Sequence, residues 1–200
     1  MKKLLYIPIF AAFAVSCGEN EQTFDNTADA LAHDANVVAE EGANDIYEYN
    51  DALLSEQTLL QVEFEKVIDL DDRDVPEEEF ILETKKSIEA IHDIQATLDK
   101  IEPYGAGGEG FLQAVKDFAV ETETYIKLYL DYSEIMSTPD EDLTEDQIND
   151  FYEAFEPVDE AYNEAFDAII EKQEIFAAKN GTSVEEESSF DAHAVYEETK

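Results

Sequence analysis

The chain has a single cysteine, no tryptophan and only 12 lysine and arginine residues in 200 positions. One cysteine excludes an intramolecular disulfide and a cysteine-based metal cluster. The few basic residues face 51 acidic ones, which gives a formal charge of −39. A chain this acidic repels phosphates, so nucleic acid is not an expected partner. Hydrophobic residues still make up 44% of the chain, which is enough for a core.

The cysteine, Cys17, ends a short apolar run at the N-terminus. Two lysines precede an apolar stretch over residues 4–15, the order typical of a secretory signal peptide. This stretch is too short to span a bilayer as a helix. Ala14-Val15-Ser16-Cys17 resembles the lipobox of bacterial lipoproteins. The resemblance implies that residues 1–16 are removed and that Cys17 becomes the lipid attachment point, through which the protein contacts a membrane.

An acidic cluster, Gly18-Glu-Asn-Glu-Gln22, directly follows the cysteine. It looks like the surface-export signals of Bacteroidota lipoproteins. Position 18 is also not the aspartate that is associated with inner-membrane retention in enterobacteria. The sequence therefore predicts a lipid anchor in the outer membrane, with the cell surface favoured over the periplasmic face.

Apolar residues recur at spacings of three and four over most of the remaining chain, and no run alternates with period two. This pattern predicts an all-α fold. Short connections favour antiparallel neighbours, so we expect an up-down-up-down four-helix bundle with long helices over residues 39–181. The expected helices cover 39–69, 76–102, 110–137 and 144–180. Residues 17–38 are expected to form an acidic tether, part of it a candidate short helix, and 182–200 an acidic, mostly disordered tail.

Turn and capping residues agree with these boundaries. Pro76 is followed by three glutamates, as suits the first turn of a helix, and Pro103–Gly110 holds four of the seven glycines. Thr144 and Gln147 form a capping-box pattern before the last helix. Pro157 inside that helix predicts a kink or a break.

Three patterns resemble chemical sites and fail on detail. Glu89 and His92 form one E-x-x-H pair, whereas a ferritin-like di-iron site needs two. Acidic loops at 69–74 and 140–142 lack the glycine and final glutamate of an EF-hand. The glycine loop lacks a Walker lysine and a preceding strand. The sequence therefore assigns no catalytic residue, no metal ligand and no cofactor.

Polar and aromatic residues interrupt the apolar stripes. The polar set could form a cross-helix network that fixes helix register, which we favour, or line a ligand pocket. It comprises Asn50, Gln57, Thr84, Gln95, Thr122 and Gln173. The aromatic residues of the last two helices have core spacing, and tyrosines at the core edge could also present a partner-binding strip. They are chiefly Tyr125, Tyr129, Tyr132, Phe151, Tyr152, Phe155, Tyr162 and Phe166.

Tyr49-Asn50-Asp51, followed by Gln57 and three more amphipathic segments behind a lipobox, resembles an uncharacterised family of bacterial surface lipoproteins of spirochaetes and Bacteroidota. The resemblance would cover about residues 39–181. It implies a helical, lipid-anchored, surface-associated protein without an established activity. No functional residue other than Cys17 follows from it.

Together these patterns predict a non-enzymatic, lipid-anchored envelope protein whose helical ectodomain serves binding or interaction, with the partner left open and a protein at the cell surface as one candidate. The alternative is a lipoprotein that binds metal ions or a small ligand through its acidic loops or a polar core pocket.

Overall fold

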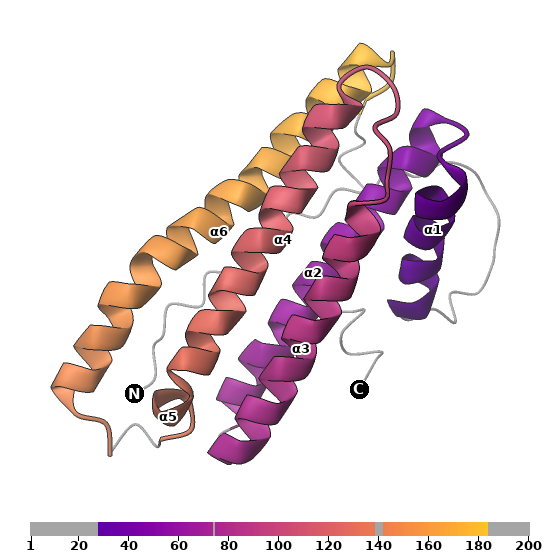
Figure 1. Cartoon of the computed structure of the whole chain (residues 1–200). Coiled ribbons are helices and arrows are strands. Elements are labelled where there is room, and N and C mark those ends of the chain that lie inside the picture. The colour runs from indigo at the N-terminus through magenta and orange to yellow at the C-terminus, as the bar shows by residue number, and fades with distance from the viewer. Residues whose placement is uncertain (1–27, 74, 139–141, 184–200) are drawn as a thin grey trace.

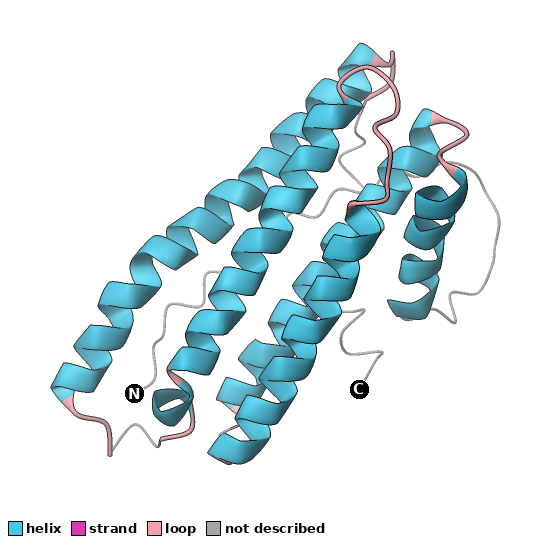
Figure 2. Ribbon diagram, in the orientation of Figure 1, coloured by secondary structure: helices cyan, strands magenta, loops and turns pink. Residues whose placement is uncertain are grey.

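The computed structural model describes residues 28–73, 75–138 and 142–183, and its regular structure is helical throughout this part (Figures 1 and 2). The all-α prediction is therefore confirmed. The helices are α1 (Ala28–Glu41), α2 (Ile46–Asp72), α3 (Glu77–Leu98), α4 (Gly108–Asp131), α5 (Ser133–Met136) and α6 (Glu145–Lys179). The signal peptide, Cys17, residues 18–27 of the tether and residues 184–200 of the tail lie outside the described residues.

The helices pack together around a shared core. Helix α2 packs against α1, α3 and α4, and α4 packs against both α3 and α6. Figure 1 shows α3, α4 and α6 side by side, with α1 beside the N-terminal part of α2. The backbones of α2 and α6 are not closely packed, and these two helices meet mainly through side chains.

The helix expected over 39–69 starts later, at Ile46, while the short helix considered within the tether is present as α1. Helix α1 ends at Glu41, because Gly42 adopts a left-handed conformation with φ of 80°. The Gly42 amide donates a hydrogen bond to the Val38 carbonyl at 3.0 Å, which closes the helix end. Helix α1 folds back on the protein and buries Ala35 and Val38. The apolar period runs through the break because both helices bury one face in the same core.

Other boundaries differ less. The segment expected over 110–137 is divided at Tyr132 into α4 and the short α5, and α3 ends at Leu98. The capping box is present: the Gln147 amide donates to the Thr144 hydroxyl oxygen at 3.3 Å, and the Thr144 amide donates to the Gln147 side chain at 3.1 Å. Helix α6 continues through Pro157, so the break considered for that position is wrong.

Aromatic rings form a continuous part of the core between α4, α6 and α2. Tyr125, Tyr129, Phe151 and Phe166 are buried, as the stripe predicts. Phe64 of α2 contributes a ring that stacks on Tyr162 and meets Tyr125 edge-on, both at a centroid distance of 4.9 Å. Since offset and edge-on ring pairs are favourable beyond their buried area, this cluster holds α6 to the other helices.

Tyr49 ties the start of α2 to the start of α4. Its side chain is fully buried, and its hydroxyl donates to the Gly108 carbonyl at 2.8 Å. A Cβ at Gly108 would lie 3.2 Å from the Tyr49 ring, so the absence of a side chain lets the ring approach α4 closely. The ring also contacts Phe176 of α6 at 5.5 Å. Burial raises the pKa of Tyr49, so its hydroxyl remains a donor.

We expect Tyr49→Phe to lower the free energy of unfolding by about 1 kcal/mol, because it removes one buried hydrogen bond and keeps the ring. Urea denaturation measures the change. Tyr47→Phe is the matched control, since Tyr47 lies on the same helix and is 38% exposed. Equal effects of the two substitutions would contradict a role for the Tyr49 hydroxyl.

Candidate functional site

The two residues of the E-x-x-H pair have different surroundings. Glu89 is exposed on α3, and the side chain of His92 is 54% exposed and pairs with Glu123 of α4 instead. Within residues 28–73, 75–138 and 142–183, no three His, Cys, Asp or Glu side chains are grouped so that they could hold a metal ion. Part of each acidic loop, including Asp74 and Asp140, lies outside the described residues. Arg73 pairs with Asp69 in the first of these loops at 3.2 Å.

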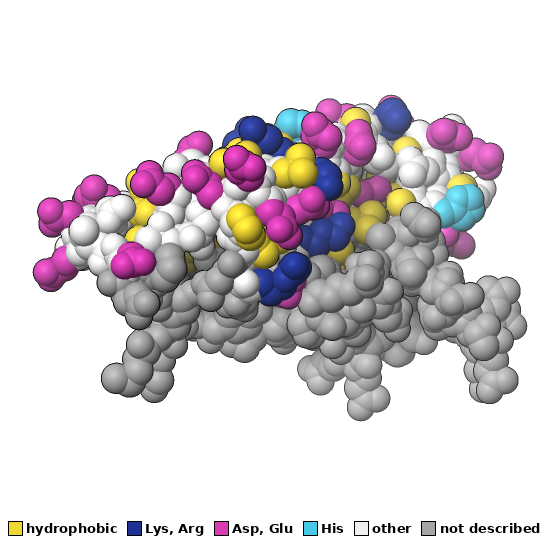
Figure 3. Space-filling model, turned by 90° about the horizontal axis from the view of Figure 1, so that it is seen from below, with side chains coloured by type: hydrophobic (Ala, Val, Ile, Leu, Met, Phe, Trp, Pro, Cys, Tyr) yellow, Lys and Arg dark blue, Asp and Glu magenta, His cyan; other side chains and the backbone are white. Residues whose placement is uncertain are grey.

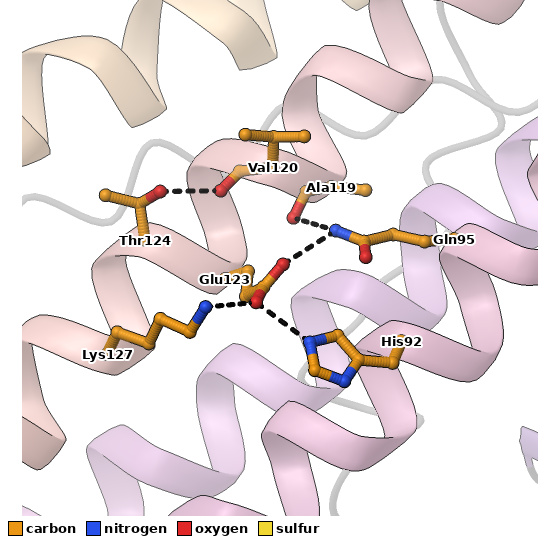
Figure 4. A network of polar contacts seen from close by, with 7 residues as sticks. All are labelled: His92, Gln95, Ala119, Val120, Glu123, Thr124 and Lys127. Atoms are coloured by element: carbon orange, nitrogen blue, oxygen red, sulfur yellow. Dashed lines mark hydrogen bonds and ion pairs between the residues drawn. The ribbon is translucent and has the colours of Figure 1, made fainter.

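Glu123 is the centre of a polar network between α3 and α4 (Figure 4). His92 Nε2 and Glu123 Oε1 are 2.8 Å apart, and Gln95 Nε2 donates to Glu123 Oε2 at 2.9 Å. Lys127, one turn further along α4, forms an ion pair with the same carboxylate. Gln95 also reaches the Ala119 carbonyl at 3.5 Å. Both oxygens of one carboxylate therefore join the two helices.

The electrostatics of the network hold Glu123 in its charged form. Burial alone would raise the pKa of Glu123, but the hydrogen bonds from Lys127, His92 and Gln95 outweigh it and lower the pKa to about 2. An ionised carboxylate only accepts hydrogen bonds, so Nε2 of His92 must carry the hydrogen that lies between them. A carboxylate with this low pKa is a poor proton donor or acceptor near neutral pH. The network acts as a clamp between two helices.

The polar set of the core is divided into separate contacts. Gln173 Nε2 of α6 donates to Asn50 Oδ1 of α2 at 2.9 Å, and both residues are buried. Gln57 bonds Gln61 one turn on at 3.4 Å, and the Thr122 hydroxyl donates to the Phe118 carbonyl at 2.8 Å. The hydroxyl of Thr84 has no hydrogen-bond partner among the described residues. Asn50 and Gln173 support the interpretation that buried amides fix helix order.

The aromatic cluster reaches the surface along α6 and the end of α4. Tyr132, Phe155 and Tyr162 are half-buried, and Tyr152 is 41% exposed. Phe151, which is buried, contacts Tyr132 and Phe155 at centroid distances of 5.4 Å. We call Tyr132, Tyr152, Phe155 and Tyr162 the aromatic strip. Tyr152 is its exposed member, while the other three rings are partly covered, and Tyr162 packs against Phe64 and Tyr125.

Acidic side chains are spread over the face seen in Figure 3, while lysines and arginines gather near its centre among hydrophobic side chains. Several of the described lysines form ion pairs. Lys86 pairs with Glu83 at 2.7 Å, and Lys116 of α4 pairs with Asp99 at 2.9 Å. These lysines therefore form ion pairs with acidic side chains of the surface around them.

Sequence reasoning missed two carboxylates. Glu123 lies beside the α4 stripe, and nothing in its spacing names His92 as its partner. Glu56 of α2 is only 2% exposed. The sequence did contain a pattern that indicates burial of Glu56. A stripe at spacings of four and three runs through Tyr49, Leu53, Glu56 and Leu60, and it is as regular as the stripe that was assigned through Gln57.

Comparison of the chain with protein-family models, with curated proteins and with solved structures gives no significant match. In the described part of the chain, no helix is both long and apolar enough to cross a membrane.

We expect Glu123→Gln to lower the free energy of unfolding near pH 7 by about 1 kcal/mol, because it weakens charge-assisted hydrogen bonds across α3 and α4. The lowered pKa means that the ionised carboxylate stabilises the fold above its ordinary pKa of 4.5 and that this contribution is lost as pH falls toward 2. The difference between the two proteins should therefore shrink between pH 4.5 and pH 2.

Denaturation of both proteins across this pH range tests the expectation. Glu121→Gln on the same helix removes one charge outside the network and serves as the control. A difference between wild type and Glu123→Gln that does not change with pH would contradict the clamp.

Asn50→Ala should lower the free energy of unfolding by about 1–3 kcal/mol, because it leaves the buried Gln173 amide without this partner. Replacing both residues with leucine should recover most of the loss. Chemical denaturation of Asn50→Ala, Gln173→Ala and the variant that carries both alanines gives the coupling energy. Gln57→Ala, whose side chain bonds only within α2 at Gln61, is the control. Additive effects at Asn50 and Gln173 would show that the pair does not act together.

Proposed function

We propose that this protein is a lipid-anchored protein of the bacterial cell envelope whose helical ectodomain binds a protein partner and catalyses no reaction. The observation that carries the proposal is Ala14-Val15-Ser16-Cys17 at the end of an apolar run that two lysines precede. In this proposal Cys17 carries the lipid, and the anchor lies in the outer membrane with the ectodomain at the cell surface. Two or more acyl chains suffice for stable anchoring, whereas one chain holds a protein only marginally.

The aromatic strip supports binding as the role of the ectodomain. Tyrosine gives a large apolar area and a hydroxyl at low conformational cost, and it is enriched at protein interfaces. The strip lies on the N-terminal half of α6 and beside α5, and Pro157 lies among its residues on α6. The surrounding acidic surface suits a partner with basic residues at the rim of the contact.

We further propose that α2, α3, α4 and α6 form an up-down-up-down four-helix bundle to which α1 is added. Packing of α2 on α3, of α3 on α4 and of α4 on α6 supports this topology. The bond from Asn50 to Gln173 joins the first of these helices to the last across 123 positions of sequence. The resemblance to surface lipoproteins of spirochaetes and Bacteroidota is consistent with the same arrangement.

Expression of the full chain in a bacterium that processes lipoproteins tests the anchor. Cys17→Ala should move the protein out of the membrane fraction and abolish incorporation of labelled palmitate. Ser16→Ala keeps a small residue before the cysteine and should behave as wild type. If the Cys17→Ala protein remains in the membrane fraction at the wild-type level after a carbonate wash, the proposed lipid anchor at Cys17 is contradicted.

A further inference from the structure

Asp159 of α6 is a half-buried carboxylate that the protein orients with neutral groups. Its Oδ1 atom accepts a hydrogen bond from the Tyr125 hydroxyl of α4 at 3.3 Å, and its Oδ2 atom accepts one from Asn163 Nδ2 at 3.2 Å. Within the described ranges, the ion pairs of lysine, arginine and histidine all go to other carboxylates. Asp159 is therefore held in place without a cation from these residues.

Glu123 shows how the same chain treats another partly covered carboxylate. There Gln95 supplies a neutral donor, and His92 and Lys127 form ion pairs with the carboxylate. A partly covered carboxylate gains more from a cation than an exposed one does, because water screens the pair less. Asp159 has neutral donors like Gln95 but no counterpart of Lys127, so a cation from outside would gain this contact.

Each oxygen of Asp159 has a lone pair left for such a cation. A carboxylate oxygen accepts two hydrogen bonds, and the described residues give each oxygen of Asp159 one. A guanidinium carries parallel N–H groups that match the two oxygens of a carboxylate, whereas an ammonium is a single point of charge. The arrangement of acceptors therefore favours arginine over lysine.

Rings of the aromatic strip flank Asp159 along α6, which runs beside α4 (Figure 1). Phe155 lies one turn before Asp159 and Tyr162 one turn after it, and their rings contact Tyr125 at centroid distances of 5.5 and 5.3 Å. Tyr152, the exposed ring, lies two turns before Asp159, about 10 Å along the helix. One guanidinium cannot contact both Asp159 and Tyr152, so a partner needs two cations to use both.

The surroundings of the strip carry one sign of charge. Between Lys127 and Lys172 the chain has no lysine, arginine or histidine, while Asp and Glu recur every few positions. Glu153, Glu156 and Glu160 are exposed on α6 around the strip. Such a surface attracts a basic segment and repels a second copy of this chain, whose net charge is negative.

We propose that the surface of α6 over residues 152–162 binds an arginine-rich segment of the partner protein, with one guanidinium paired to Asp159 and another packed on Tyr152. This rests on the proposed function, to which it adds the chemistry of the partner. Arginine stacks on aromatic rings through its planar, weakly hydrated group. The contacts from Tyr125 and Asn163 orient the Asp159 carboxylate before the partner arrives, so binding has fewer groups to order.

Titration of the purified full chain into a fluorescently labelled peptide in which arginine alternates with serine tests the site by anisotropy. Salt is held at about 0.15 M, where exposed charges more than about 8 Å apart are largely screened. We expect saturable binding of this peptide, weaker binding of its lysine counterpart, and no binding of the counterpart with citrulline, which is uncharged. Equal affinity for the lysine or the citrulline peptide would overturn the proposal, as would no binding of the arginine peptide.

Three variants locate the contact. Asp159→Asn should raise the Kd about tenfold or more, since it removes the charge and nearly keeps the shape of the side chain. Tyr152→Leu, at an exposed position, should raise it about two- to fivefold. Glu160→Gln removes an exposed charge next to Asp159 and should change the Kd by less than about twofold. If Glu160→Gln weakens binding as much as Asp159→Asn, the peptide binds the acidic surface as a whole and the assigned site is wrong.

This proposal and the lipid anchor fail separately. Peptide binding is measured in solution and does not depend on whether Cys17 carries a lipid. Conversely, a protein that does not bind the arginine peptide would still leave the membrane fraction on Cys17→Ala substitution if the anchor is correct. Urea denaturation of Asp159→Asn distinguishes a lost contact from a lost fold, and Tyr152→Leu tests the same surface at a position outside the core.

Discussion

Burial of aromatic and aliphatic side chains along α2, α4 and α6 is the constraint on which the rest of this structure depends. A chain with a formal charge of −39 repels itself, and that repulsion disfavours any compact state. Exposed ion pairs contribute only about 0–1 kcal/mol each, so the pairs at Lys86 and Lys116 cannot offset it. The ring cluster around Phe64, Tyr125 and Tyr162 can, because each ring buries a large apolar area.

Apolar packing alone does not select one order of helices, and the polar contacts supply that selection. The bond between Asn50 and Gln173 joins α2 to α6, the hydroxyl of Tyr49 joins α2 to α4, and Glu123 joins α4 to α3. Helix α2 takes part in two of these three contacts. A shift of α2 by one turn would break both contacts, so its register determines how the other helices are placed.

The sequence predicts the helical class well because the three-and-four spacing of apolar residues is strong along α3, α4 and α6. It places the start of the next helix at 39 rather than at Ile46, since the stripe passes from Ala39 through Ala43 without interruption although the left-handed Gly42 ends α1. It also does not give the partner of His92, because Glu123 lies 31 positions away and helix packing brings the two together. Long-range pairs of polar residues leave no local pattern.

Two glutamates show why composition alone says little about how this acidic chain behaves. Donors from two helices surround Glu123 and hold its pKa near 2, whereas burial without such donors raises the pKa of Glu56 to about 8. The same type of side chain therefore joins two helices as a carboxylate at Glu123, whereas at Glu56 it is buried without donors that would stabilise its charge. A count of 51 acidic residues treats them as equal. Of the two, Glu56 is the one whose charge changes near neutral pH, because burial without compensating donors favours its neutral form.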